Sequence, residues 1–279
     1  MEGRELKNDN YSRENNSIHH AVRGRLSLGR EILNKVPEIT IFFWIIKVLT
    51  TGMGEVASDY LANHIDPVIA VIIAAIALAV SLVIQFSVRK YVPWIYWITV
   101  IMVSIFGTMA ADVVHVVFGI PYIASTIFFV AALAIIFVIW YLSEKTLSIH
   151  SIYTRRREFF YWATILTTFA LGTAAGDMTA TTMHLGYLYS GVLFVVIIAI
   201  PVLGYWLLSL NEIFAFWFAY IITRPLGASF ADWMGVPYAR GGLGLGTGVV
   251  SLCLTIIIFI LIGYITITHK DVKDFKSME

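Results

Sequence analysis

Four acidic residues occupy the same position of a motif that recurs along this 279-residue chain. In each copy an aromatic residue and a Trp are followed by nine residues, a Gly, four more residues and an Asp. The copies are Phe43-Trp44…Gly54…Asp59, Tyr96-Trp97…Gly107…Asp112, Tyr161-Trp162…Gly172…Asp177 and Phe216-Trp217…Gly227…Asp232. Each Asp lies in a very apolar segment, where a carboxylate is costly and a functional role is its default interpretation. Four such acids predict cation binding or proton transfer.

The residues beside the four Asp differ from copy to copy. Glu55 lies four residues before Asp59, which puts both on one helix face. The second copy adds His115, and the third adds His184, on the stripe of its Asp if the helix continues that far. Carboxylate and imidazole together suit Mn²⁺, Zn²⁺ or a similar cation, whereas carboxylates alone suit Mg²⁺ or protons. The predicted metal ligands are Asp59, Asp112, Asp177, Asp232, Glu55, His115 and His184.

Two basic residues lie within the same apolar segments. Lys47 is near the middle of the first segment, and Arg224 precedes Gly227 by three residues. Buried charges in lipid are expected to pair, so we expect each cation to be neutralised by one of the acids, as a salt bridge or a proton switch. Five acids against two cations leave a net charge of −3. This charge favours a path for cations or protons over a path for anions.

The fourth copy departs most from the others. Pro225 is expected to break the helix just before Gly227, and a glycine-rich stretch follows at 241–248. This stretch is not a dinucleotide loop, because no strand precedes it. Flexible backbone predicts a gate at Gly227 and Pro225, with a tight helix crossing as the alternative. For the motif Gly residues we favour close helix packing over local unwinding. The motif Trp residues are interpreted as anchors at the membrane surface.

These residues must be positioned by membrane-spanning helices. The chain is 59% hydrophobic and 13% charged, and its mean hydropathy is +0.81, whereas globular domains carry about 25% charged residues. A spanning helix needs roughly 20 apolar residues. Eight segments qualify, which predicts an all-α integral membrane protein. They are 38–60, 67–88, 93–117, 120–142, 158–182, 186–209, 212–234 and 243–267.

The eight spans group into four repeats of two helices each. We expect a tail at 1–35, partly amphipathic, a membrane domain at 36–267 and a second tail at 268–279. The repeats cover 36–89, 90–143, 156–210 and 211–267. Two spans per repeat give all four the same orientation, as helical hairpins around an axis normal to the membrane. Lys and Arg gather in the tails and alternate connections, which predicts that both termini are cytoplasmic.

The chain resembles a known bacterial family. Its members carry four copies of a two-helix "repeat of unknown function". The residues that carry the resemblance are Lys35-Val36-Pro37-Glu38 leading to Phe42-Phe43-Trp44, the segment Gly54-Glu55-Val56-Ala57-Ser58-Asp59 and the three later copies of the motif. The resemblance covers about residues 36–267. It implies a polytopic protein of the bacterial inner membrane and a transporter, and it brings no substrate.

The function predicted from these features is secondary transport or export of a metal cation, coupled to protons. The expected partners are the metal cation, protons and the lipid bilayer, with a homo-oligomer left open and no nucleic acid. No permanently bound cofactor and no enzymatic activity are predicted. The alternative is proton-coupled transport of a small organic solute, with Tyr122, Tyr187 and Tyr189 lining its pocket. A membrane-embedded metalloenzyme and a scaffold are less favoured, because no paired-His motif or activated nucleophile is present.

Overall fold

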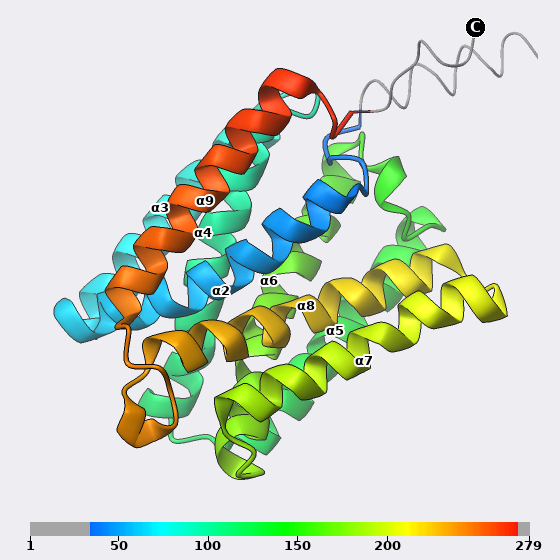
Figure 1. Cartoon of the computed structure of the whole chain (residues 1–279). Coiled ribbons are helices and arrows are strands. Elements are labelled where there is room, and N and C mark those ends of the chain that lie inside the picture. The colour runs from blue at the N-terminus through cyan, green and yellow to red at the C-terminus, as the bar shows by residue number, and fades with distance from the viewer. Residues whose placement is uncertain (1–33, 273–279) are drawn as a thin grey trace, which may run out of the picture.

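A computed structural model describes residues 34–272 of the chain, and the amphipathic helix predicted within the N-terminal tail lies outside this part. The described part contains eight helices long and apolar enough to cross a membrane, as the sequence predicts (Figure 1). They are α2 (Ile41–His64), α3 (Pro67–Ser87), α4 (Pro93–Asp112), α5 (Tyr122–Glu144), α6 (Arg155–Asp177), α7 (Gly186–Leu208), α8 (Glu212–Gly235) and α9 (Thr247–Thr268). The protein is therefore an all-helical, multi-pass membrane protein.

The first helices of the four repeats form a closed inner ring. Helix α2 packs on α4, α4 on α6, α6 on α8, and α8 returns to α2. These four inner helices are 44–67% buried along their spans, whereas α3, α5, α7 and α9 are only 17–22% buried. The four outer helices expose Ile, Val, Leu and Phe on their outer faces. Such an apolar surface is what a helix presents to lipid.

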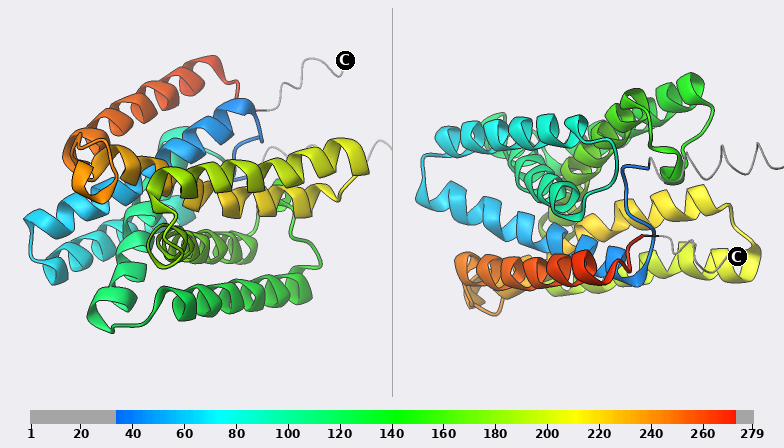
Figure 2. Two further views of the ribbon diagram at one scale, coloured as in Figure 1. Left: turned by 60° about the horizontal axis from the view of Figure 1, so that its bottom comes forward. Right: turned by 90° about the horizontal axis from the view of Figure 1, so that it is seen from above.

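Each outer helix packs on the inner helix of the next repeat. Helix α3 lies on α4, α5 on α6, α7 on α8, and α9 closes the ring by lying along α2 (Figure 2). The two helices within a repeat contact each other much less. The two helices of each expected hairpin are therefore splayed apart, and the repeats interlock. An outer helix with a uniformly apolar surface can pack wherever a neighbouring groove is available, so its sequence did not specify the partner.

The motif glycines are contact points between neighbouring inner helices. A Cβ on any one of them would overlap the next inner helix, at Ser104 for Gly54, Phe169 for Gly107, Arg224 for Gly172 and Thr51 for Gly227. Each of these contact residues lies three positions before the Gly of its own repeat. All four Gly lie within α-helices. Close packing is thus confirmed at these positions, and the unwinding alternative is wrong.

The inner helices depart from a regular α-helix, or from the sequence prediction, at three places. Helix α8 runs without a break from Glu212 to Gly235 with Pro225 inside it, so the predicted break is wrong. Its neighbours hold it there, because Pro225 packs against Gly172 of α6. By contrast, α4 and α6 pass into short π-helical segments, Val113–Val117 and Met178–Thr182, directly after their motif Asp. A π turn changes the rotation per residue, so side chains beyond it leave the face that precedes it.

Candidate functional site: an acidic cavity on the axis

The axis of the inner ring is lined by one stripe from each helix. The stripe residues recur every four positions and end at the motif Asp. In α2, for example, they are Phe43, Lys47, Thr51, Glu55 and Asp59. A spacing of four keeps side chains on one helix face, one turn above another. The axis is therefore built of layers, each with one residue from every repeat.

An aromatic layer closes the axis at the end that carries most of the basic residues, named here the basic end. The aromatic residue of each repeat packs on the Trp of the next. The ring centroids are 5.8 Å apart for Phe43–Trp97, 5.6 Å for Tyr96–Trp162, 6.2 Å for Tyr161–Trp217 and 5.7 Å for Phe216–Trp44. Trp97, Trp162 and Trp217 are at most 4% exposed. The interpretation of these Trp residues as membrane-surface anchors is therefore wrong.

Hydrogen bonds and an ion pair reinforce the closure at the basic end. The hydroxyl oxygens of Tyr96 and Tyr161 are 2.5 Å apart within the aromatic layer. Lys35 Nζ pairs with Glu158 Oε2 at 2.6 Å, and the fully buried Glu158 also accepts a bond from Gln85. A buried carboxylate is tolerated where its partners satisfy it, as here. These contacts tie the start of the described chain to α3 and α6.

Lys47 does not pair with an acid among residues 34–272. Its Nζ is buried without a hydrogen-bond partner in that part of the chain. It lies 4.3 Å from the ring centre of Phe169 and 4.2 Å from that of Tyr220. Aromatic faces carry a negative potential that attracts a cation. The predicted neutralisation of Lys47 by a carboxylate is thus wrong, because rings from α6 and α8 occupy the space around it.

Arg224 pairs with Glu55, which confirms that an acid neutralises it. Its Nη2 lies 2.5 Å from Glu55 Oε2 and also donates to Thr173 Oγ1 at 2.7 Å and to Thr108 Oγ1. Glu55, Thr108 and Thr173 each directly follow the Gly of their own motif. Side chains of the first three repeats thus surround the guanidinium of Arg224. The fourth repeat supplies it from the next layer toward the basic end. Glu55 and Arg224, at which the first and fourth copies differ from the others, thus form an ion pair.

A cavity of about 440 Å³ opens beyond this pair, at the end opposite the basic end. Its lining includes all four motif Asp residues together with Glu55. Carboxylate oxygens of Glu55, Asp177 and Asp232 lie within 4.8 Å of one another. Residues from the turns after the inner helices complete the walls. The four acids therefore converge, near the cavity end of the inner helices rather than at their middle.

Among the described residues, Asp232 is the motif Asp that is buried with an unpaired carboxylate oxygen. It is 6% exposed, and its Oδ1 has no hydrogen-bond partner in the described part of the chain. A buried carboxylate oxygen without a partner is costly, and such sites call for an ion, a proton or water. Asp232 also lines the cavity. This orphaned oxygen and the nearby oxygens of Glu55 and Asp177 are of the type that coordinates a hard cation.

The two predicted histidine ligands lie outside the cavity lining. His115 bonds to Ile120 O at 3.1 Å, and its ring packs against that of Tyr122 in a tilted arrangement. His184 is exposed and has a left-handed backbone conformation with φ of 57°. His115 lies within the π turn after Asp112, and His184 follows the π turn after Asp177, so the helical stripe assumed from spacing does not reach them. The cavity therefore does not include them, and their role as metal ligands stays a prediction.

Three further residues shape the acidic cavity. Tyr122 and Tyr187 line it, whereas Tyr189 is 69% exposed and does not. Arg240, from the short helix between α8 and α9, also lines the cavity. The sequence did not assign Arg240 to the site, although it is the one basic residue in the connections at this end of the described chain. That exception to the charge pattern is the signal that identifies it.

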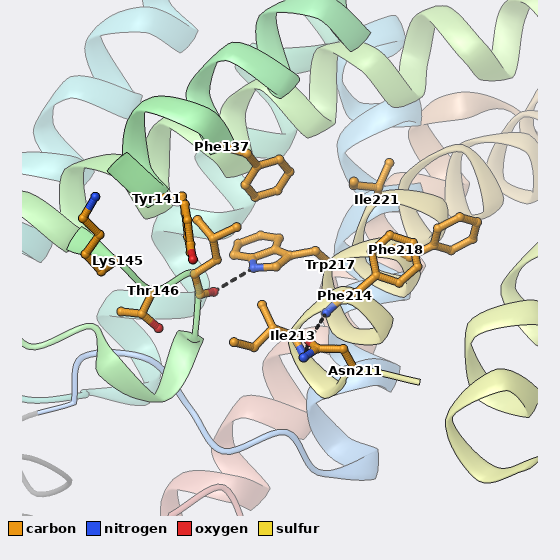
Figure 3. Close-up of a pocket in the computed structure, with 11 residues that line it drawn as sticks. Phe137, Tyr141, Lys145, Thr146, Asn211, Ile213, Phe214, Trp217, Phe218 and Ile221 are labelled. Atoms are coloured by element: carbon orange, nitrogen blue, oxygen red, sulfur yellow. Dashed lines mark hydrogen bonds between the residues drawn. The ribbon is translucent and has the colours of Figure 1, made fainter. Parts of the chain in front are cut away.

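A second cavity lies at the basic end between α5 and α8, with a volume of about 490 Å³. Figure 3 shows its aromatic walls, including Phe137, Phe214 and Trp217. The Trp217 indole donates a hydrogen bond to Leu147 O at 2.9 Å. Lys145 is the one charged residue in its lining. Within the described chain, this pocket offers no carboxylate to a metal ion.

Fold and site define a membrane protein of four interlocked two-helix repeats around an acidic axial cavity. The chain belongs to the family described as Repeat of Unknown Function (DUF347), whose model matches residues 42–91, 95–146, 160–210 and 215–271. These four matches coincide with the four repeats of the structure. No curated protein and no solved structure matches the chain.

Proposed function

We propose that the protein is a secondary transporter of a metal cation, coupled to protons. The observation that carries this proposal is the convergence of Asp59, Asp112, Asp177, Asp232 and Glu55 on one cavity. Protons and a cation that compete for the same carboxylates would couple their two gradients. The cavity acids and the neighbouring arginines, Arg224 and Arg240, support a cationic substrate, because five carboxylates against two guanidinium groups leave a formal charge of −3.

The closed and open ends of the axis support transport by alternating access. The aromatic layer and the Lys35–Glu158 pair close the basic end, whereas the cavity lies at the other. Basic residues favour the cytoplasmic side of a membrane. We therefore propose a bacterial inner-membrane protein with cytoplasmic termini, in a state in which the acids face outward. Arg240 would then lie at the outer mouth of the path.

The proposal is tested by cation flux into proteoliposomes loaded with a metal-sensitive dye. Wild-type protein is compared with Asp177→Asn, Asp232→Asn and the exposed-acid control Glu212→Gln. We expect flux with a simultaneous pH change for the wild type and the control, and loss of both signals for the two cavity variants. Metal-dependent flux that persists when all four motif Asp are converted to Asn would refute the proposal.

One observation favours an organic cation as the alternative substrate. The cavity has a volume of about 440 Å³ and includes the rings of Tyr122 and Tyr187, whereas bare metal ions need only a few oxygen ligands. Aromatic rings attract organic cations. The alternative predicts that Tyr122→Ala weakens binding of a quaternary ammonium probe and leaves Mn²⁺ binding intact. Binding of Mn²⁺ without binding of such probes would exclude it.

A further inference from the structure

The carboxylate of Glu55 lies between the guanidinium of Arg224 and the acidic cavity. On one side its Oε2 is 2.5 Å from Arg224 Nη2. On the other side it lines the acidic cavity, and one of its oxygens lies within 4.8 Å of oxygens of Asp177 and Asp232. One carboxylate therefore forms the boundary between the closed part of the axis and the cavity.

Apart from Glu55, the guanidinium of Arg224 has only neutral acceptors in the described part of the chain, the hydroxyls of Thr108 and Thr173 and the carbonyl of Thr51. Its Nη1 reaches Thr51 O only at 3.4 Å, and its Nε has no hydrogen-bond partner among residues 34–272. An arginine has five N–H donors, so a buried guanidinium with few good acceptors depends strongly on its one carboxylate. The hydroxyls of Thr108 and Thr173 would still hold it if Glu55 turned away.

A cation held by Glu55, Asp177 and Asp232 would compete with this ion pair. Both cations would share one carboxylate in a buried site, where like charges repel strongly because little water screens them. A cation can therefore occupy the site only when the ion pair between Glu55 and Arg224 weakens. The same pair joins α8 to α2, so loosening it weakens a contact between two inner helices.

We propose that Arg224 is a tethered cation that competes with the transported cation for Glu55. This inference rests on the proposed function and deepens it in two ways. The three converging groups offer only carboxylate oxygens, which select hard divalent cations such as Mn²⁺, Mg²⁺ or Ca²⁺. Arg224 keeps the inner helices together until such a cation arrives and takes over Glu55.

The test is equilibrium binding of Mn²⁺ to the purified full-length protein. The variants are Arg224→Gln and, as a control for lost basic charge, the exposed Arg156→Gln. Removing the competitor should tighten Mn²⁺ binding about tenfold, within the range of coupling between linked sites. The control should bind like the wild type. In both the wild-type and the Arg224→Gln backgrounds, adding Asp232→Asn should abolish binding.

A second variant covers the case in which Arg224→Gln does not fold. Thr173→Val removes a hydroxyl that holds the guanidinium, so Arg224 depends more on Glu55 and Mn²⁺ should bind several-fold more weakly. Unchanged affinity in Thr173→Val, or unchanged or weaker affinity in folded Arg224→Gln, overturns the competition while leaving the cation site intact. If the wild type itself binds no Mn²⁺, Mg²⁺ or Ca²⁺, the cation site fails, and the proposed function fails with it.

Discussion

The two halves of the axis follow the repeat to different extents. At the basic end, all four copies supply an aromatic residue and a Trp, and each pair packs in the same way on the next copy. In the cavity half, the four Asp are equivalent, but Glu55 and Arg224 have no counterparts of the same type. The symmetric half is closed and well packed, whereas the asymmetric half holds the cavity and the orphaned Asp232 oxygen.

We propose that this contrast separates the residues that build the protein from those that select its ligand. A closed ring of identical contacts needs equivalent side chains at every junction, since one poor junction would open the ring. A binding site has the opposite requirement, because a single ligand is bound by particular groups at particular distances. The departures at Glu55 and Arg224 therefore lie where the ligand is expected.

The largest expected effect comes from breaking the aromatic layer. Trp97→Ala removes a side chain that is 1% exposed and should lower the stability by about 3–5 kcal/mol, as for other buried aromatic residues. Thermal unfolding in detergent measures this loss. The control is Trp206→Ala, at a Trp that is 77% exposed, which should change the melting temperature little. Equal effects of the two substitutions would contradict the closed layer.

A smaller loss of stability is expected when a motif glycine is filled. A Cβ on Gly227 would overlap Thr51 and lie 2.8 Å from Val48 O, so Gly227→Ala should cost about 1–3 kcal/mol by overpacking. Gly263→Ala in α9 is the matched control, because no described heavy atom lies within 4 Å of its added Cβ. The control should be neutral or slightly stabilising, since Ala favours helices. A stable Gly227→Ala variant would refute the tight crossing.

Replacing Lys47 should have a modest effect, because this cation makes ring contacts and no ion pair within the described chain. Lys47→Met trades cation–π attraction against the desolvation of a buried charge, so we expect a change within about 1 kcal/mol. Melting temperatures of Lys47→Met and Arg224→Met, measured side by side, compare the two buried cations. A larger loss for Lys47→Met than for Arg224→Met would reverse the roles given to them.

The smallest effect is expected at the two histidines that the sequence suggested as ligands. His184 is exposed, and the ring of His115 bonds to Ile120 O outside the cavity lining. The double variant His115→Ala, His184→Ala should therefore bind Mn²⁺ within about twofold of the wild type, by the ordinary variation of surface substitutions. A large loss of affinity would show that a histidine enters the site.

The sequence predicted the features that depend on local pattern. The eight spans follow from runs of apolar residues, and the shared position of the four Asp follows from the repeat. The sequence did not predict the rings around Lys47 or the partner of each outer helix, because these depend on packing between segments far apart in the chain. It also placed His115 and His184 on stripes that continue past Asp112 and Asp177. The π turns there have no clear sequence signal.

The central claim is that the acids of the cavity bind a cation. Its most direct test is the anomalous scattering of Mn²⁺ in crystals of the wild-type protein. We predict a peak within coordination distance of carboxylate oxygens of Asp177 and Asp232, with Glu55 turned toward it, and no such peak in Asp232→Asn. A site elsewhere in the molecule, or a peak that survives in Asp232→Asn, would contradict this claim.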